Sequence, residues 1–316
     1  MKNGNWCVGN LEEKVELKRF GGVVACALAV CTAVAAPVTF TGDDARAAHE
    51  AAGAFVKECT PRHAGTLRGR LAASWLLDRA SWCGADASLD PFRDETPFGE
   101  RQFCNVVIEF PGTKTNNHWI VIMSHFDTPS TAKQPCAGAN DGASTCGLLI
   151  ALADAINRTG PHPDNIALVW TDGEECFKAY GPNDGFHGSR HLVDQFRQKK
   201  RSVKTAICLD MLGDKDLHVI VPGNSTAILK KLAKQAAEKA GLKDLLKIDE
   251  SLVVTDDHSA FLSAGCPAIN FIDFDYGPGN AWWHTPEDTM DKISEKSLLS
   301  SGRLVAAFLN ILLYGK

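Results

Sequence analysis

Two adjacent carboxylates, Glu174 and Glu175, follow an apolar run that extends from Ile166 to Trp170. Such a run is typical of a buried strand. Paired charges at the end of an apolar strand are costly unless a cation or a catalytic role compensates them. A metal ion would satisfy one carboxylate and leave the other free to transfer a proton. The alternative is a solvated turn after a strand, and the rest of the chain bears on that choice.

Similar side chains occur in four other segments, each near a predicted strand end. They are His125 with Asp127, then Asp141, Asp210 and His284. The carboxyl ends of strands in an open α/β sheet lie along one edge, and ligands bind there. Two imidazoles and three carboxylates that converge at this edge suit Zn²⁺, as a single ion or as a pair.

Asp127 lies two residues after His125. At a strand end this spacing places both side chains on one face, so Asp127 could orient the imidazole without binding the metal itself. The alternative is that Asp127 caps a turn or a helix.

The composition indicates a globular chain with ample core. The 316 residues are 45% hydrophobic, and 33 basic against 38 acidic residues give a net charge of −5. We expect no nucleic-acid partner, because the chain has no basic block or stripe of basic and aromatic residues. No linker-like stretch interrupts the chain after residue 40, so we predict one domain over residues 37–316. We also expect a monomer.

The N-terminal segment resembles an export signal. Lys18 and Arg19 precede a small, apolar run of 17 residues, Phe20 to Ala36, which closes on an Ala-x-Ala pattern. The run is shorter than the roughly 20 residues that span a membrane. We therefore predict that residues 1–36 are a signal peptide, with an N-terminal anchor as the alternative. The protein would then be exported: periplasmic, secreted or membrane-anchored.

Strand and helix patterns alternate along the rest of the chain. Helices are predicted at 43–59, 66–82, 143–156, 188–200, 226–240, 257–264 and 293–313. Strands are predicted at 102–110, 118–124, 166–171, 205–209, 218–221 and 268–272, with a loop at 92–97. This order predicts an α/β three-layer sandwich, in which helices flank a central, largely parallel mixed sheet.

We expect the cysteines and the remaining histidines to have structural roles. Export permits disulfides, and Cys59 with Cys83 is a plausible pair, whereas three cysteines in apolar runs are expected in the core: Cys104, Cys208 and Cys266. We expect His187 and His191 on a helix surface, and His258 as a helix cap or a partner of Asp256.

Six motifs occur in a characteristic order: SHFD, GANDGAS, DGEE, LDML, TDDHSAF and WHTPEDT. In this order they resemble the zinc exopeptidase family M28, from about Phe103 to the C-terminus. The resemblance implies two zinc ions held by five ligands: His125, Asp141, Glu175, Asp210 and His284. Asp141 would bridge the ions, and Glu174 would be the general base.

The chain is more closely similar to the glutaminyl-peptide cyclotransferase branch of that family, from about Arg62 onward. The similarity rests on DGEECFKAYGPNDGFHGSRHL and DPFRDETPFGERQFCNVVIEF. It implies one zinc, held by Asp141, Glu175 and His284, with Glu174 as proton shuttle. It further implies a hydrogen-bonded acidic pair, Asp210 and Asp256, and a substrate pocket walled by Trp283 and by Tyr180, which replaces a Trp of the animal cyclases.

Three functions remain open from the sequence. The resemblance favours a zinc enzyme that acts on peptide or protein N-termini and cyclises N-terminal glutamine to pyroglutamate with release of ammonia. The second is a dizinc aminopeptidase that releases the N-terminal residue by hydrolysis. The third is a non-catalytic binding module of the same fold, which the complete set of ligand-type residues disfavours.

Overall fold

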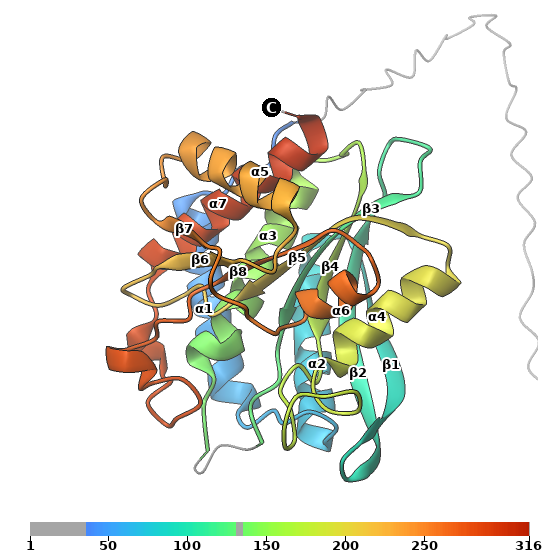
Figure 1. Cartoon of the computed structure of the whole chain (residues 1–316), viewed down its shortest axis with the longest axis vertical. Helices are drawn as coiled ribbons and strands as arrows, with labels where there is room; N and C mark the ends of the chain where they lie inside the picture. Colours follow the sequence, from blue (N-terminus) through green and yellow to red (C-terminus); the bar gives the residue numbers. More distant parts are fainter. Residues whose placement is uncertain (1–35, 131–134, 316) are drawn as a thin grey trace, which may run out of the picture. The chain divides into compact units, whose positions relative to one another are not determined.

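A computed structural model describes residues 36–130 and 135–315 (Figure 1). The predicted export segment, residues 1–36, lies outside the described residues except for Ala36. The described part is an eight-stranded mixed sheet flanked by helices on both faces. This architecture confirms the predicted three-layer α/β sandwich.

The sheet has the strand order β1-β2-β4-β3-β5-β8-β6-β7. Its members are β1 (Asp86–Thr96), β2 (Gly99–Phe110), β3 (His118–His125), β4 (Asn165–Thr171), β5 (Ser202–Asp210), β6 (Val219–Pro222), β7 (Leu246–Asp249) and β8 (Ala268–Ile272). The four central strands β4, β3, β5 and β8 are mutually parallel, whereas β2 and β6 join them antiparallel. The carboxyl ends of the four central strands therefore share one edge of the sheet.

Helices form two layers. They are α1 (Gly42–Cys59), α2 (Leu67–Ala80), α3 (Thr145–Thr159), α4 (His187–Gln198), α5 (Ala227–Lys239), α6 (His258–Ser263) and α7 (Glu295–Tyr314). Helices α1, α2, α3, α5 and α7 pack into the larger core on one face, and α4 and α6 cover the other (Figure 1). Helix α7 is apolar and long enough to cross a membrane, but 67% of its most apolar window is buried, as in a core helix.

Strand β4 shows why the sequences of the central strands are continuous apolar runs. Ile166, Leu168 and Trp170 face the larger core, whereas Ala167 and Val169 face the core under α4 and α6. A strand buried on both faces needs apolar side chains at every position. The same property made β4 recognisable in the sequence.

The predicted loop at 92–97 is wrong, because residues 86–96 form the edge strand β1. It pairs antiparallel with β2 over its whole length, from Asp86 opposite Glu109 to Thr96 opposite Gly99. Most of its side chains are exposed or half-buried, so it has no apolar run that would reveal a strand. Backbone pairing with β2 defines it instead, and the short edge strand β7 was missed for a similar reason.

The predicted disulfide between Cys59 and Cys83 is also wrong, since all eight cysteines in the described part are free. Cys59 ends α1 and borders a surface hollow beside Leu67 and Leu71, in the first half of α2. Cys83 follows the far end of that helix, whose 14 residues extend about 21 Å. Cysteines can pair only when their Cα atoms lie within about 7 Å.

Two of the three expected core cysteines, Cys104 and Cys208, are buried, whereas Cys266 is half-buried. The prediction of a surface His187 is wrong: it is fully buried, and its Nδ1 lies 2.7 Å from Asp94 Oδ2 on β1. Edge strand β1 covers the start of α4, which the sequence pattern of α4 alone could not show.

Candidate active site

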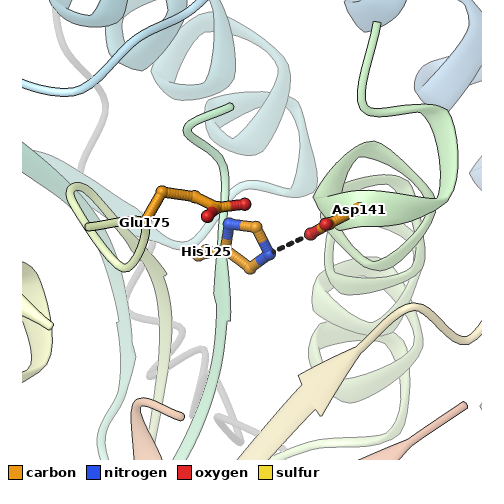
Figure 2. Close-up of side chains that lie close together, drawn as sticks. All are labelled: His125, Asp141 and Glu175. Atoms are coloured by element: carbon orange, nitrogen blue, oxygen red, sulfur yellow. Dashed lines mark ion pairs between the residues drawn. The ribbon is translucent and has the colours of Figure 1, made fainter. Parts of the chain in front are cut away.

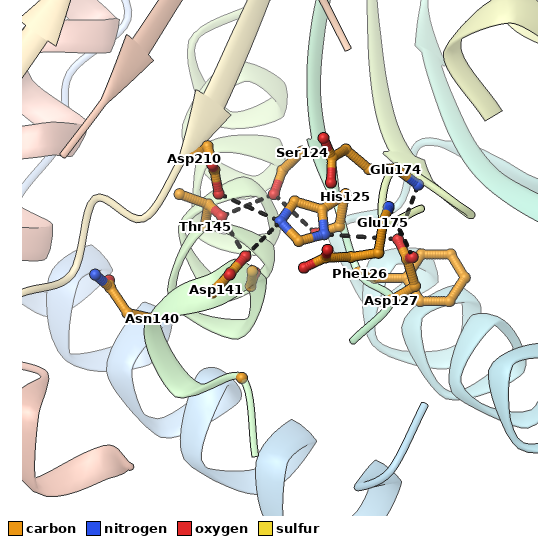
Figure 3. A network of polar contacts seen from close by, with 12 residues as sticks. Ser124, His125, Phe126, Asp127, Asn140, Asp141, Thr145, Glu174, Glu175 and Asp210 are labelled. Atoms are coloured by element: carbon orange, nitrogen blue, oxygen red, sulfur yellow. Dashed lines mark hydrogen bonds and ion pairs between the residues drawn. The ribbon is translucent and has the colours of Figure 1, made fainter. Parts of the chain in front are cut away.

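The shared edge of the central strands brings two predicted side chains together, His125 and Asp210 (Figure 3). His125 is the last residue of β3 and lies level with Thr171, the last residue of β4. Asp210 ends β5, two residues after the Cys208 that pairs with Met123, so it lies level with His125. The register of parallel strands thus places an imidazole beside a carboxylate at the sheet edge.

Asp141 reaches this edge from the segment Ala139–Ser144, which leads into α3. The carboxylate of Asp288 holds that segment: it accepts hydrogen bonds from the backbone N–H groups of Asn140 (2.7 Å) and Asp141 (3.3 Å). Gly142 lies directly against His125, and a Cβ there would be 2.5 Å from the His125 carbonyl oxygen. Only glycine allows the segment to approach so closely.

The buried guanidinium of Arg62 joins the same two pieces of chain. It donates to the carbonyl oxygens of Phe126 (2.5 Å), Ala137 (2.7 Å) and Gly138 (2.7 Å). Phe126 follows His125, and Gly138 precedes the segment of Asp141. Arg62 therefore fixes the distance between the strand end and the loop that carry these two side chains.

Asp141 lies between the two imidazoles. Its Oδ1 is 2.9 Å from His125 Nε2, and its Oδ2 is 3.2 Å from His284 Nε2. Each imidazole has a second carboxylate: His125 Nε2 is 3.2 Å from Asp210, and His284 Nε2 is 2.9 Å from Glu175. Ligand atoms of His125, Asp141 and Glu175 all lie within 4.8 Å of one another (Figure 2).

His284 comes from the loop after β8 and has a left-handed backbone, with φ of 55°. A non-glycine residue in this region is strained by about 1–3 kcal/mol, and such strain is concentrated at functional sites. The indole of Trp283 stacks on the His284 ring at 3.9 Å between centroids. The backbone turn directs the imidazole toward Asp141 and Glu175.

Asp127 links the strand end to the turn after β4. Its two carboxylate oxygens accept the backbone N–H groups of Glu174 (3.1 Å) and Glu175 (3.2 Å), and its Oδ1 lies 3.5 Å from His125 Nδ1 (Figure 3). The predicted spacing of Asp127 and His125 on one face is thus present, with a second contact to the turn of the paired glutamates.

The buried carboxylates at or next to this edge include Asp127, Asp141, Glu174, Glu175, Asp210, Asp256 and Asp257. Two buried polar atoms, His125 Nδ1 and Asp141 Oδ2, have ion-pair contacts to Asp127 and His284 but make no hydrogen bond of regular geometry among the described residues. So much buried negative charge is stable only with positive charge nearby. Imidazole and carboxylate groups that converge within these distances fit a divalent cation such as zinc.

The pKa values of the two adjacent glutamates are raised by different neighbours. Burial, together with the charge of Glu175, raises the pKa of Glu174 well above its usual range. Burial and Asp141 raise the pKa of Glu175 to about 7, while His284 opposes them. Burial lowers the pKa of His284, but its ion pairs with Asp141 and Glu175 outweigh burial and raise that pKa to about 10.

Glu174 faces a cavity of about 200 Å³ that also contacts Asp141, Glu175 and His284. The hydroxyl of Tyr180 donates to Glu174 Oε2 at 3.4 Å. The remaining residues of the cavity wall are Asp210, Asp256, Trp283, Phe274, Ile272, Thr255 and residues 252–254. The two residues expected in a substrate pocket, Trp283 and Tyr180, therefore lie at one small cavity beside the imidazole–carboxylate cluster.

Asp210 and Asp256, which the resemblance implies as a hydrogen-bonded pair, both line the small cavity. Asp210 points its Oδ1 at His125, and Asp256 accepts from the amide of Asn270 at 2.8 Å. The two carboxylates still interact through charge: burial and Asp210 raise the pKa of Asp256 to about 6. His258 does not orient Asp256; its Nε2 lies 3.2 Å from the Asn224 amide nitrogen.

Sequence reasoning missed Asp288 and Arg62 as parts of the site. Asp288 lies inside the motif WHTPEDT, so an acidic residue close after His284 was a signal. No sequence signal pointed to Arg62, because its hydrogen-bond partners are backbone carbonyls distant in the sequence. Asp257, which accepts the Thr171 hydroxyl at 2.5 Å, was likewise missed.

A helix-flanked sheet with an imidazole–carboxylate cluster at the carboxyl edge of its parallel strands defines a metal-dependent α/β enzyme. The model of the peptidase family M28 matches residues 105–309, and the chain belongs to this family. The resemblance of the motifs to family M28 is thereby confirmed.

Relatives of this chain include glutaminyl cyclases. The chain is 28% identical to the mouse (Mus musculus) glutaminyl-peptide cyclotransferase-like protein, over 79% of this chain and 70% of the relative. Its structure is similar to the crystal structure of an Acidobacteriales bacterium glutaminyl cyclase, with a TM-score of 0.81 over 89% of this chain and 97% of that one. The two sequences are 31% identical. A leucine aminopeptidase precursor from Bacteroides thetaiotaomicron shares the fold at 22% identity and TM-score 0.76, over 90% of this chain and 100% of that one.

Proposed function

We propose that this chain is a zinc-dependent enzyme that cyclises the N-terminal glutamine of peptides to pyroglutamate and releases ammonia. The observation that carries the proposal is the position of Glu174. Its carboxylate faces the small cavity, next to the cluster of Asp141, Glu175 and His284 but without an ion pair to either imidazole. A free carboxylate with a raised pKa beside a metal site is suited to proton transfer.

In this proposal Asp141, Glu175 and His284 hold one zinc ion. When bound, zinc polarises the side-chain carbonyl of the glutamine as a Lewis acid. Glu174 accepts a proton from the substrate α-amine as its nitrogen attacks that carbonyl carbon. Glu174 then returns the proton to the side-chain nitrogen, the carbon–nitrogen bond breaks, and ammonia leaves.

Further residues have supporting roles. Trp283 and Tyr180 enclose the glutamine side chain, and Asp127 orients His125 and the turn of the paired glutamates. Asp210 and Asp256, whose charges are coupled, share a proton or bind the intermediate. Residues 37–316 form one catalytic domain, which is exported and acts as a monomer on peptide N-termini without a nucleic-acid partner.

The second candidate is a dizinc aminopeptidase, in which Asp141, Glu175 and His284, together with His125 and Asp210, would hold two ions. One observation favours it: His125 Nε2 lies within 3.2 Å of both Asp141 and Asp210, which repeats the arrangement around His284. Glu174 would then serve as base for hydrolysis.

Mass spectrometry of two peptides separates the candidates. A Gln-initiated peptide is expected to lose ammonia and keep its length, and a Leu-initiated peptide is expected to stay intact. Release of free leucine would instead establish the aminopeptidase, and no change in either peptide would refute both. Zinc analysis of the purified chain is expected to give one ion per chain for the cyclase and two for the aminopeptidase.

Metal removal is expected to make stability fall as pH rises. Burial raises the pKa of Glu175 and of Asp257 to about 7, so the folded, metal-free chain keeps protons that the unfolded chain releases above about pH 4. Stability is therefore lost between about pH 4 and pH 7. Zinc needs its proposed ligand Glu175 deprotonated, so its stabilising effect grows with pH.

Thermal unfolding with zinc and with a chelator checks this expectation. The Tm difference between the two samples is expected to widen from about pH 5 to pH 7. A difference that stays constant or narrows over this range would contradict it.

A further inference from the structure

A second cavity of about 470 Å³ lies between α4 and α6, which are neighbours on one face of the sheet (Figure 1). We call it the α4–α6 groove. Its wall includes Phe186, Arg190 and Val193 on one side and Ser259, Ala260 and Ser263 on the other. Tyr180 and Thr255 line both the groove and the small cavity of the candidate active site. The two cavities are therefore adjacent and share a boundary.

We propose that the α4–α6 groove binds the residues of the peptide substrate that follow its N-terminal residue. The inference rests on the proposed function, although it holds for cyclisation and for hydrolysis alike. At about 200 Å³, the small cavity is below the range of about 300–1,000 Å³ that encloses a drug-sized ligand, so it accommodates a single residue. The rest of a peptide must lie outside this cavity, and the groove adjoins it at Tyr180 and Thr255.

The lining of the groove suits a peptide. The rings of Tyr180 and Phe186 stack at 4.7 Å and, with Val193 and Ala260, give an apolar surface near the shared boundary. Ser259 and Ser263 add hydroxyl groups from α6. This combination of an apolar floor and scattered polar groups is typical of ligand sites in proteins.

Charge in the groove is positive on balance. Arg190 and Arg197 line it together with one carboxylate, Asp194. Asp194 lies 3.7 Å from Arg197 on the same helix, and Asp94 lies 3.8 Å from Arg190. Because Asp194 and Asp94 offset part of the charge of the two arginines, we expect only a modest preference for an acidic over a basic side chain after the first residues of the peptide.

A bulky substitution tests whether peptides occupy the groove. Ser263 is exposed at the end of α6, and Ser263→Trp would fill the groove. The readout is kcat/KM for Gln-Ala-Ala-Ala divided by kcat/KM for glutamine amide, which lacks the following residues. This ratio is expected to fall at least about tenfold, the order contributed by one buried apolar side chain. Gln198→Trp, exposed on α4 outside the groove lining, is the matched control and is expected to keep the wild-type ratio.

A charge reversal tests the preference. Wild type is expected to favour Gln-Ala-Glu-Ala over Gln-Ala-Lys-Ala by about twofold to fivefold, the range for exposed ion pairs. Arg197→Glu is expected to abolish or invert this preference. Lys199→Glu makes the same charge change two residues further, outside the groove lining, and is expected to retain it.

The outcomes separate two failures. If wild type cyclises glutamine amide but Ser263→Trp keeps the wild-type ratio, the groove does not bind substrate and the inference is overturned. If wild type acts on neither glutamine amide nor any Gln-initiated peptide, the proposed cyclase function itself is wrong. If Ser263→Trp fails to fold, the Arg197→Glu series decides: an unchanged preference overturns the inference.

Discussion

Glu174→Gln is expected to retain bound zinc and to lose a hundredfold or more in kcat, about the contribution of a positioned general base. The substitution keeps the shape of the side chain and its hydrogen bond from Tyr180, but it removes the group that accepts the proton. We expect zinc to stay bound, because the three proposed ligands, Asp141, Glu175 and His284, are unchanged. The loss is expected under both cyclisation and hydrolysis, because Glu174 is the proton acceptor in each.

Zinc content and steady-state kinetics of the same preparation check this result. Glu287→Gln is the matched control, since Glu287 is an exposed glutamate in the loop after His284 and makes the same chemical change outside the cavity. A Glu174→Gln variant that turned over at the wild-type rate would exclude both mechanisms. One that lost its zinc would show that Glu174 is a ligand instead of a base.

Asp141→Asn is expected to weaken zinc binding by more than about a hundredfold and to abolish activity at ordinary zinc concentrations. Loss of a residue that merely supports a ligand already weakens metal binding about 10- to 100-fold. Asp141 has a larger role, because its two oxygens face both His125 and His284. The amide keeps the size of the side chain but loses its charge and one acceptor oxygen.

Competition with a chromophoric chelator measures this change, with Asp216→Asn at an exposed aspartate as the control. Wild-type zinc affinity in Asp141→Asn would contradict the proposed ligand set. The same titration counts the ions. If zinc occupies only the Glu175 and His284 side, His125→Ala retains one ion per chain, whereas a dizinc site loses one of two.

The positions of His125, Glu174, Glu175 and Asp210 at strand ends could be predicted from the sequence. Each follows a run of apolar residues that is buried on both faces of the sheet, and such a run carries its own signal. The ends of parallel strands meet at one edge, so convergence of these side chains followed from strand identity alone. The prediction failed where a strand lacks an apolar run, as in β1, which is defined only by its pairing with β2.

The amino-acid sequence alone was therefore sufficient to predict the fold class, the ligand-type residues and the edge of the sheet where these residues lie, because local apolar patterns encode the central strands. Tertiary structure decided which atoms meet. Asp210 points at His125, whereas Asp256 accepts a hydrogen bond from Asn270. The left-handed backbone of His284 directs its imidazole toward Asp141. Buried Arg62 and Asp288 bind backbone atoms of the segment that carries Asp141. Tertiary structure also decided that a groove between α4 and α6 adjoins the cavity at Tyr180. Backbone contacts and side-chain directions depend on residues distant in the chain, so no local pattern carries them.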